Sequence, residues 1–324
     1  MKKSFKSLLC VLFAAIMLLS ISSCGKTTET PENGENGSGE TTETPENSKK
    51  GKIVMEDNGG NKVILILVDG MRPDAMEQCG NSYIDELKKN CAYTMNAKTI
   101  YPSKTLPAHL SLFYSIPPEK HGTEKNEFTP REIKDLDDHG LFERLHGSGK
   151  KTCMYYSWEP LRDVAAPESL TASEMLRYQD FEAFDEDILI TERALKGIEE
   201  IKPDFAFIYI GSTDSTGHNY GWMTGQYLER VSAALDRIKE IIDATGERYS
   251  IIITADHGGS SKNHGNNTPE DMTIPMFFYG KDIKAGEISG EVSIMDITPT
   301  VADIIDVKKP KSWEGKSLWA DIKK

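Results

Sequence analysis

The chain has 324 residues, and its 51 Asp and Glu side chains outnumber its 38 Lys and Arg side chains, which gives a formal net charge of −13 at pH 7. Because polyanions are bound through clusters of basic side chains, this balance argues against non-specific nucleic-acid binding. Beyond its N-terminal segments the chain is long enough for one large hydrophobic core, and it shows no obvious internal linker.

The first 24 residues are typical of a secretory signal. Lys2 and Lys3 precede an apolar stretch at 8–19, and small residues follow it up to Cys24. The stretch is too short for a stable membrane span, so we expect a cleaved signal peptide over residues 1–23. The placement of Cys24 resembles a bacterial lipobox, which implies an extracytoplasmic lipoprotein anchored to the bacterial cell envelope membrane through Cys24. The alternative is an ordinary secreted protein with a chance cysteine.

Residues 24–51 are predicted to be a disordered linker. The sequence Thr-Thr-Glu-Thr-Pro-Glu-Asn occurs twice, at 27–33 and 41–47, and the residues between the two copies are Gly, Glu, Asn and Ser. This composition offers nothing apolar to bury. We therefore expect one folded domain over residues 52–324.

Three short apolar segments, at 63–68, 205–210 and 249–254, predict buried strands. Each is followed by potential metal ligands, and open α/β sheets place their chemistry at the carboxyl ends of strands. Carboxylate oxygens and imidazole nitrogens in this mixture suit Zn²⁺ or a similar divalent ion, and six such groups are enough for two ions. The six are Asp69, Asp214, His218, Asp256, His257 and His264.

Together with a fourth segment, Lys104-Thr105-Leu106-Pro107, these strand ends resemble the alkaline phosphatase superfamily, and within it the type I phosphodiesterase/nucleotide pyrophosphatase family. The resemblance extends from about Lys62 to the C-terminus. It implies that Thr105 is the nucleophile and also a metal ligand, and that Asn126 contacts the phosphate. It further implies two metal ions, one held by Asp69, Asp256 and His257 and the other by Asp214, His218 and His264.

The chain departs from this family at two places. Many members have Pro-Asn-His after the nucleophile, whereas this chain has Pro107-Ala108-His109. They also carry a long insertion before the last metal-binding His, whereas here His264 comes seven residues after His257. The compact spacing is similar to that of the shorter bacterial members and lacks the insertion that selects the substrate. The sequence therefore supports the reaction class better than the substrate.

Chemistry independently favours these residues. A Thr hydroxyl is a poor nucleophile at neutral pH, but a divalent ion can ionise it without an adjacent base. Thr105 stands ahead of a helix-like stretch at 106–113, which would place a phosphate near the positive end of a helix. Asn126 offers an uncharged donor to a phosphate oxygen. Lys104, Tyr156 and Trp158 are candidates for substrate contacts.

The remaining pattern alternates strands and helices, which predicts an α/β fold with a mostly parallel sheet covered by helices on both faces. The resemblance implies that this fold is of the alkaline phosphatase type. Apolar residues at helical spacing predict helices at 187–201, 227–244 and 296–307, and the apolar run at 275–280 predicts a strand. After loss of the signal and lipidation of Cys24, three cysteines remain. A Cys79–Cys91 disulfide is one alternative, and the odd count leaves at least one thiol free or paired between chains.

The sequence thus indicates a hydrolase of phosphodiester or nucleotide pyrophosphate bonds with two divalent ions, Zn²⁺ first among them. The alternatives are a phosphomonoesterase or phosphotransferase of the same superfamily, a sulfatase, and a surface binding protein without turnover. The sulfatase nucleophile motif fits poorly, because aligning Ser103 to it misplaces Pro107. We expect diesters to react faster than monoesters, unless a distant Arg131 or Arg162 folds into the pocket.

Overall fold

The computed structural model describes residues 61–127, 140–176 and 186–324, and these belong to one unit, Glu56–Lys324. The predicted signal peptide, Cys24, the predicted linker and Arg131 lie outside the described residues. Within the described part, no helix combines the length and the apolar character that crossing a membrane requires.

The described strands form one eight-stranded sheet, whose order is β4-β3-β5-β1-β6-β7-β2-β8. The strands β4, β3, β5, β1 and β6 run parallel, β7 pairs antiparallel with both β6 and β2, and β8 pairs parallel with β2. The bounds of the strands are β1 (Val63–Val68), β2 (Ala92–Lys98), β3 (Thr152–Tyr156), β4 (Ala172–Met175), β5 (Phe205–Ile210), β6 (Ser250–Thr254), β7 (Thr273–Tyr279) and β8 (Gly286–Glu287).

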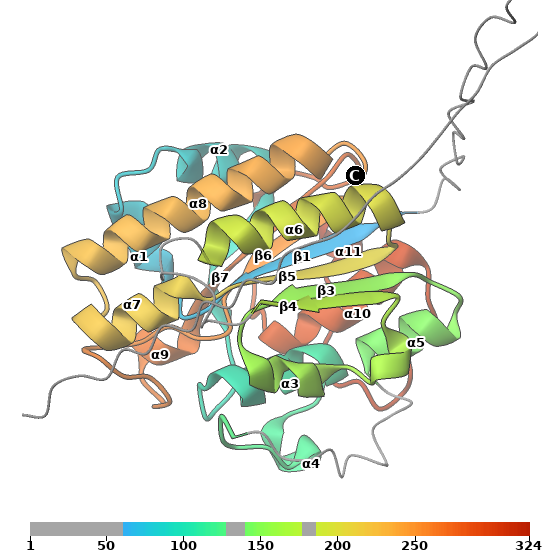
Figure 1. Ribbon diagram of the computed structural model, residues 1–324, viewed down its shortest axis with the longest axis horizontal. Coiled ribbons are helices and arrows are strands. Elements are labelled where there is room, and N and C mark those ends of the chain that lie inside the picture. Colours follow the sequence, from blue (N-terminus) through green and yellow to red (C-terminus); the bar gives the residue numbers. More distant parts are fainter. Residues whose placement is uncertain (1–60, 128–139, 177–185) are drawn as a thin grey trace, which may run out of the picture. The chain divides into compact units, whose positions relative to one another are not determined.

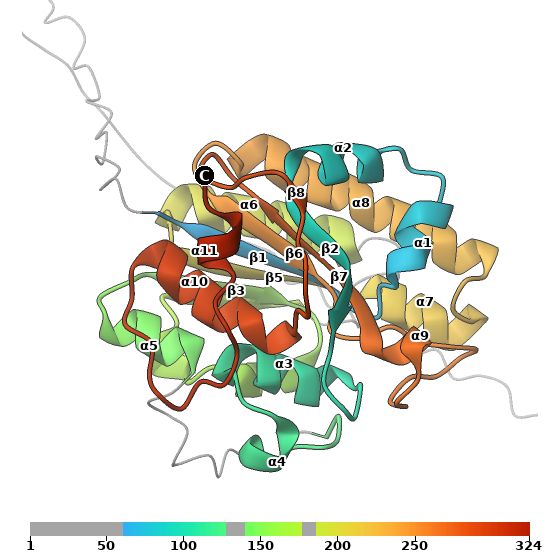
Figure 2. The same ribbon diagram turned by 180° about the vertical axis from the view of Figure 1, so that it is seen from behind.

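Helices cover both faces of the sheet (Figures 1 and 2). The long helices α6 and α8 lie on one face with α1 and α2, and α3, α5 and α10 lie on the other. The bounds of the α-helices are α1 (Pro73–Gln78), α2 (Tyr83–Asn90), α3 (Thr105–Tyr114), α4 (Pro118–His121), α5 (Leu141–Gly147), α6 (Glu186–Ile201), α7 (Ser212–Tyr220), α8 (Gly225–Thr245), α9 (Pro269–Met272), α10 (Ile297–Ile305) and α11 (Trp319–Ile322). The 3₁₀ helices among the described residues are η1 (Glu159–Val164), η2 (Pro167–Ser169) and η4 (Ile294–Asp296).

The core is centred on β1, which lies between β5 and β6 and is buried along its whole length. Its sequence is uniformly apolar because both faces of this strand are covered by helices. The ring of Phe113 on α3 packs against Phe142 on α5 and Phe207 on β5, with centroid distances of 5.0 and 5.1 Å. Each such ring contributes roughly 1.5–3 kcal/mol when it is removed from water.

The predicted fold class is confirmed, and the predicted elements differ from the observed ones mainly at their ends. The predicted helix at 296–307 is α10 and ends at Ile305, because Asp306 adopts a left-handed conformation with φ 62° and its N–H bonds the carbonyl of Ala302. The strand predicted at 275–280 is β7, which begins two residues earlier at Thr273.

The cysteines of the described residues form no disulfide. Cys79, Cys91 and Cys153 are all free, so the Cys79–Cys91 pairing is not present. Cys91 and Cys153 are buried, and burial raises their pKa values to about 12 and about 11, so both remain protonated thiols at neutral pH.

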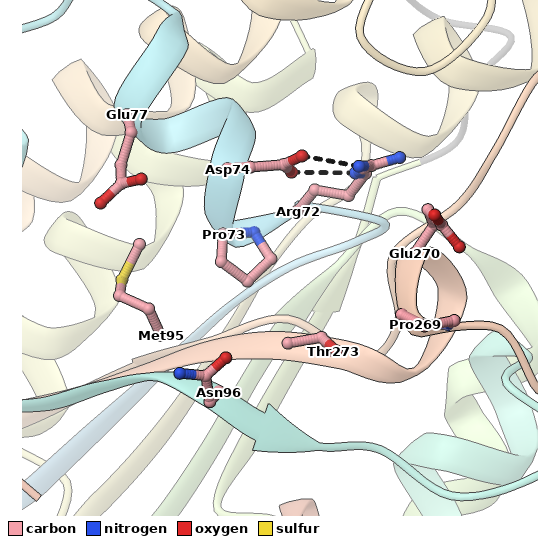
Figure 3. A pocket seen from close by; sticks show the side chains of 9 residues that line it. All are labelled: Arg72, Pro73, Asp74, Glu77, Met95, Asn96, Pro269, Glu270 and Thr273. Atoms are coloured by element: carbon pink, nitrogen blue, oxygen red, sulfur yellow. Dashed lines mark hydrogen bonds and ion pairs between the residues drawn. The ribbon is translucent and has the colours of Figure 1, made fainter.

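One cavity, of about 410 Å³, lies between α1, α9 and the β2–β7 ladder (Figure 3). At its wall the guanidinium of Arg72 donates two hydrogen bonds to Asp74, at 2.9 and 2.6 Å, and a third to the carbonyl of Gly259 at 2.9 Å. Arg72 therefore links the turn after β1 to the loop after β6. Both of these segments carry predicted metal ligands.

Candidate active site

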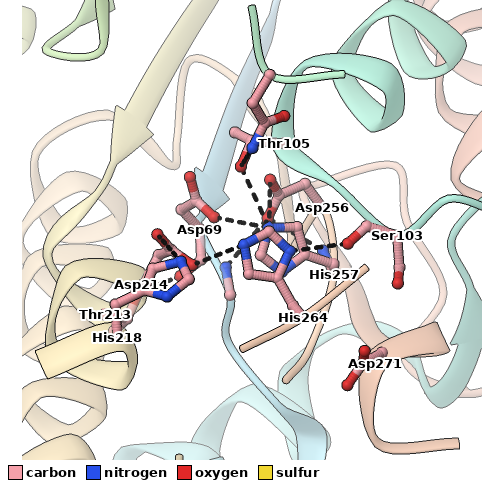
Figure 4. A network of polar contacts seen from close by, with 12 residues as sticks. Asp69, Ser103, Thr105, Thr213, Asp214, His218, Asp256, His257, His264 and Asp271 are labelled. Carbon is pink, nitrogen blue, oxygen red and sulfur yellow. Dashed lines mark hydrogen bonds and ion pairs between the residues drawn. The ribbon is translucent and has the colours of Figure 1, made fainter. Parts of the chain in front are cut away.

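Three neighbouring strands bring the predicted ligands to one edge of the sheet. Asp69 directly follows β1, Asp214 lies in the first turn of α7 just after β5, and Asp256 follows β6. The parallel register pairs Val68 with Ile210 on one side of β1 and Leu67 with Thr254 on the other. The side chains that follow these strands therefore converge (Figure 4).

The first group of candidate ligands consists of Asp69, Asp256 and His257, all of them buried. The Nε2 atom of His257 lies 3.2 Å from Asp69 Oδ1 and 3.5 Å from Asp256 Oδ2. These are the three residues that the family resemblance implies for one ion. A carboxylate pair with one imidazole nitrogen is a donor set that suits a divalent transition metal.

The second group consists of Asp214, His257 and His264. His264 Nε2 lies 3.6 Å from Asp214 Oδ1, and the rings of His257 and His264 stack with centroids 3.7 Å apart. His218, which the sequence assigns to this set, lies at its edge with Nε2 3.5 Å from Asp214 Oδ2. The structure thus brings all six predicted residues together, and His257 lies between the two groups.

Three of the imidazoles direct the same ring nitrogen, Nδ1, towards a backbone carbonyl oxygen. The Nδ1 atoms of His257, His264 and His218 lie 2.7, 2.9 and 2.9 Å from the carbonyl oxygens of Gly258, Ser103 and Lys262, respectively. A carbonyl oxygen can only accept, so each Nδ1 carries the proton and each Nε2 keeps a free lone pair. This arrangement is the usual one for metal-binding histidines, whose second nitrogen donates to an outer partner. Burial also lowers the pKa of His264 to about 4, which keeps this ring neutral at pH 7.

Buried oxygens without partners provide a direct test of whether a cation fits. Asp69 Oδ1, Asp214 Oδ1 and Asp256 Oδ2 have no hydrogen-bond partner. Burial, followed by the charges of Asp256 and Asp214, raises the pKa of Asp69 well above its usual range. A divalent cation between these carboxylates would remove both the repulsion and the unsatisfied acceptors. The residues present therefore fit a metal.

Thr105 is buried at the first position of α3, and its Oγ1 lies 3.3 Å from His257 Nε2. Asn126 is tied to the same helix end: its Oδ1 accepts from the N–H of Leu106 at 3.0 Å, and its Nδ2 lies 3.5 Å from Thr105 Oγ1. Because Oδ1 is engaged by a donor, the amide is oriented with its N–H₂ group toward Thr105.

A cavity of about 390 Å³ opens over these groups. Trp158 lines it, as the sequence proposes. Tyr156 does not line it, and its hydroxyl instead bonds the side chain of Ser173. Lys104 does not line it either, since its Nζ lies 3.4 Å from the carbonyl of Glu124. The lining residues are Asp69, Thr105, Asn126, Ser157, Trp158, Glu186, Tyr209, Gly211, Asp214, Ser215, His218 and His264.

Tyr209, Ser157, Glu186 and Ser215 are lining residues that the sequence analysis does not identify. The Tyr209 hydroxyl donates to Asp69 Oδ2, which leaves Oδ1 of that carboxylate facing His257. A signal for Tyr209 exists in the sequence, because its phenol interrupts an otherwise apolar buried strand and needs a partner.

Comparison with known proteins identifies a family that this chain matches. The family model described as "Type I phosphodiesterase / nucleotide pyrophosphatase" matches residues 63–274. The human ectonucleotide pyrophosphatase/phosphodiesterase family member 1 is 25% identical over 228 residues, which cover 62% of this chain and 24% of that protein. The chain thus matches about a quarter of the length of this relative.

Solved structures share the fold. An inactive form of murine ectonucleotide pyrophosphatase/phosphodiesterase 5 in complex with AMP superposes with a TM-score of 0.65 at 15% identity, over 80% of this chain and 98% of that chain. A 2-O GAG sulfatase superposes with a TM-score of 0.67 at 15% identity, over 81% of this chain and 74% of that chain. At these identities the structural likeness shows the fold alone.

Proposed function

Since the chain belongs to the type I phosphodiesterase/nucleotide pyrophosphatase family, we propose that it hydrolyses phosphodiester or nucleotide pyrophosphate bonds with Thr105 as nucleophile. One observation carries the proposal. Thr105 Oγ1 lies 3.3 Å from His257 Nε2, beside buried carboxylates with unpaired oxygens, at the floor of an open cavity. A hydroxyl in this position can reach a phosphorus atom bound in the cavity.

We infer that the two groups of ligands hold two divalent ions, with Zn²⁺ the ion that suits this mixture of carboxylates and imidazoles. Asp69, Asp256 and His257 would hold one, and Asp214, His264 and the adjacent His218 the other, with Thr105 Oγ1 as a further ligand. When bound, the ions would lower the pKa of the Thr105 hydroxyl and offset the charge of the phosphate.

The proposed reaction consists of two successive displacements at phosphorus. Thr105 Oγ, after losing its proton to solvent, forms a bond to phosphorus while the bond from phosphorus to the leaving alcohol breaks, and that alcohol takes a proton from water. A water molecule next attacks the same phosphorus, and Thr105 Oγ leaves and regains a proton. Asn126 donates its Nδ2–H to a non-bridging oxygen, where negative charge increases during each displacement.

The lining of the cavity favours diesters over monoesters. Among the lining residues that the structure describes there is no Lys or Arg. Arg162 instead pairs with Glu159 at 2.9 Å on the surface. A monoester carries a second negative charge that strongly basic groups would have to offset, whereas the neutral amide of Asn126 matches the single charge of a diester.

Specificity constants for an aryl phosphodiester, the matching aryl phosphomonoester and the matching aryl sulfate, measured side by side with Zn²⁺, test this proposal. We expect the diester to give the largest value. A monoester that reacts as fast or faster would favour the phosphatase alternative, and a faster sulfate ester would favour the sulfatase. We also propose that the enzyme acts outside the cytoplasm, attached to the cell envelope membrane through a lipid on Cys24, on the strength of the N-terminal sequence.

A further inference from the structure

The cavity over Thr105 has a second wall that contributes no metal ligand. Ser157 and Trp158 directly follow β3, Glu186 begins α6, and Ser215 lies on α7. In the sheet, β3 is the neighbour of β5 on the side away from β1. Because β3 runs parallel to β5, its carboxyl end opens at the same edge as the ligand cluster. This wall therefore stands beside the reacting centre, on its β3 side.

Glu186 is the charged member of this wall. Its side chain is largely buried, and the hydroxyl of Ser157 hydrogen-bonds its carboxyl group. Ser157 occupies one of the roughly four acceptor positions that a carboxylate offers. Burial and the charge of Asp187 raise the pKa of Glu186 above its usual range, and the hydrogen bond from Ser157 opposes part of this rise. A desolvated carboxylate accepts hydrogen bonds strongly and repels other anions strongly.

A contact between the first turns of α6 and α7 holds this wall in place. The carboxylate of Asp187, the next residue, bonds the hydroxyl of Ser212 and lies 3.4 Å from its backbone nitrogen. This contact fixes the first turn of α6 against the first turn of α7, so Glu186 and Ser215 keep their positions relative to each other. The subsite is therefore preorganised, which reduces the entropy cost of binding.

We propose that Ser157, Trp158, Glu186 and Ser215 form a subsite for the organic group of the phosphodiester, and that it selects hydroxyl-bearing groups and rejects anionic ones. The Glu186 carboxylate accepts from hydroxyls of the organic group, the two serine hydroxyls supplement it, and the half-buried indole of Trp158 packs against its carbon skeleton. The substrate class is thus diesters of polyhydroxylated alcohols. This inference rests on the proposed diesterase function.

Three p-nitrophenyl phosphodiesters that differ only in their second alcohol test the subsite: glyceryl, propyl and 2-carboxyethyl. For the wild-type protein with Zn²⁺ we expect kcat/KM for the glyceryl ester to exceed that for the propyl ester about tenfold, the loss typical of one hydrogen bond to a charged group. We expect the carboxyethyl ester to react about tenfold more slowly than the propyl ester, because its charge meets Glu186.

Glu186→Gln keeps the shape of the side chain and removes its charge. We expect this variant to reduce the glyceryl-to-propyl ratio severalfold and to remove most of the carboxyethyl penalty. The matched control is Glu159→Gln, an exposed carboxylate next to Trp158 that pairs with Arg162 and does not line the cavity. The control should leave both ratios as in the wild type.

The outcomes separate the subsite from the reaction. If the wild-type protein hydrolyses all three esters with similar specificity constants, the proposed subsite is wrong and the proposed diesterase function is unaffected. This test uses only the wild type, so it remains valid even if Glu186→Gln misfolds. Unchanged ratios in a folded Glu186→Gln protein overturn the role of Glu186. A wild-type protein that hydrolyses none of the three overturns the proposed function and the subsite with it.

Discussion

At Thr105 the proposed reaction depends on a single oxygen atom. Ala at this position removes that atom without adding bulk, so we expect Thr105→Ala to lower kcat for an aryl diester by a factor of about a thousand or more. Circular dichroism and metal analysis should show the fold and at least one ion retained. Thr105→Ser should keep part of the rate. Near-normal turnover of Thr105→Ala would refute the nucleophile, and Ser103 is a poor substitute because its hydroxyl donates to the carbonyl of Asn266 at 2.8 Å.

The carboxylate of Asp256 accepts backbone hydrogen bonds with one oxygen and faces the predicted ligand cluster with the other. Its Oδ1 accepts from the N–H of Gly70 at 3.1 Å and of His257 at 3.0 Å, while its Oδ2 has no hydrogen-bond partner. We expect Asp256→Ala to lose most of its bound metal and its activity, measured by elemental analysis after Zn²⁺ loading and dialysis. Asp303→Ala, a surface residue paired with Lys309, is the control. Wild-type metal content in Asp256→Ala would contradict the assignment.

His121 should make folding stability depend on pH. Its Nδ1 accepts from the N–H of Thr123 at 3.2 Å, its Nε2 lies 3.0 Å from Ser111 Oγ, and burial lowers its pKa to about 4, opposed by the charge of Glu119. The unfolded chain takes up this proton near pH 6.5 and the folded protein only near pH 4. The contribution of His121 to the free energy of unfolding is therefore fully present above pH 6.5. It is lost as the pH falls from 6.5 to 4, by up to about 3 kcal/mol in total.

Urea unfolding of the wild type and of His121→Gln at pH 7 and pH 4.5 measures this contribution. Gln can replace the Nε2–H donor but does not titrate in this range. We expect the wild type to lose about 2 kcal/mol more than the variant between these two pH values, since pH 4.5 still lies above the folded pKa of about 4. Equal losses in the two proteins would show that His121 does not account for the dependence.

At the scale of elements, the loop after β6 leaves no room for a side chain at Gly258. A Cβ on Gly258 would stand 2.0 Å from the carbonyl oxygen of Glu270, which is backbone and cannot move freely. We expect Gly258→Ala to lower the free energy of unfolding by about 1–3 kcal/mol or more, as overpacking does, and to weaken metal binding by displacing His257. Gly225→Ala, at the start of α8 with no atom within 4 Å of the added Cβ, is the control. It should be neutral or stabilising by up to about 1 kcal/mol.

Sequence reasoning succeeds for elements whose pattern is local. β1 is uniformly apolar, and β5 is apolar except for the phenol of Tyr209, because both strands lie in the middle of a sheet covered on both faces; such runs are recognisable without the structure. Their carboxyl ends meet because the strands are parallel neighbours, so Asp69 and Asp214 could be predicted to converge. The ends of α10 and β7 depend on single backbone conformations and on pairing partners, which patterns do not specify.

The remaining features depend on contacts between distant segments. Glu186 and Ser157 meet only because β3 lies beside β5, and no motif or period marks either residue. The place of His257 between the two ligand groups follows from its stacking on His264. The order of ligands in the sequence shows which residues belong to the cluster, but side-chain geometry decides how they divide between the two groups.

At the scale of the whole chain, the N-terminal sequence predicts how the protein is attached to the cell envelope membrane. If Cys24 is lipidated, the protein expressed in a bacterium should partition into the detergent phase of a Triton X-114 extraction and incorporate labelled palmitate. Cys24→Ala should abolish the labelling and prevent processing at that site. Equal labelling of both proteins, or a wild type that is released unlabelled, would favour the alternative of an ordinary secreted protein.

Metal binding should also stabilise the whole domain, because the ligands come from the strands that form its core. Without a cation, the carboxylates of Asp69, Asp214 and Asp256 stay close together with unpaired buried oxygens, which disfavours the folded state. An ion that binds only the folded protein stabilises it by about 2.7 kcal/mol per site at a free concentration one hundred times Kd. For a domain of this size that corresponds to a rise in Tm of roughly 5–10 °C per site.

Calorimetry of the protein after treatment with a chelator, and again after Zn²⁺ is restored, measures this effect. We expect a lower Tm for the metal-free protein and recovery on addition of Zn²⁺. Asp69→Asn removes one negative charge from the cluster, so it should raise the Tm of the metal-free protein and diminish the gain on adding Zn²⁺. Identical melting curves with and without metal, once elemental analysis has verified both states, would mean that the cluster is stable without a cation, and the argument from its unpaired oxygens would fail.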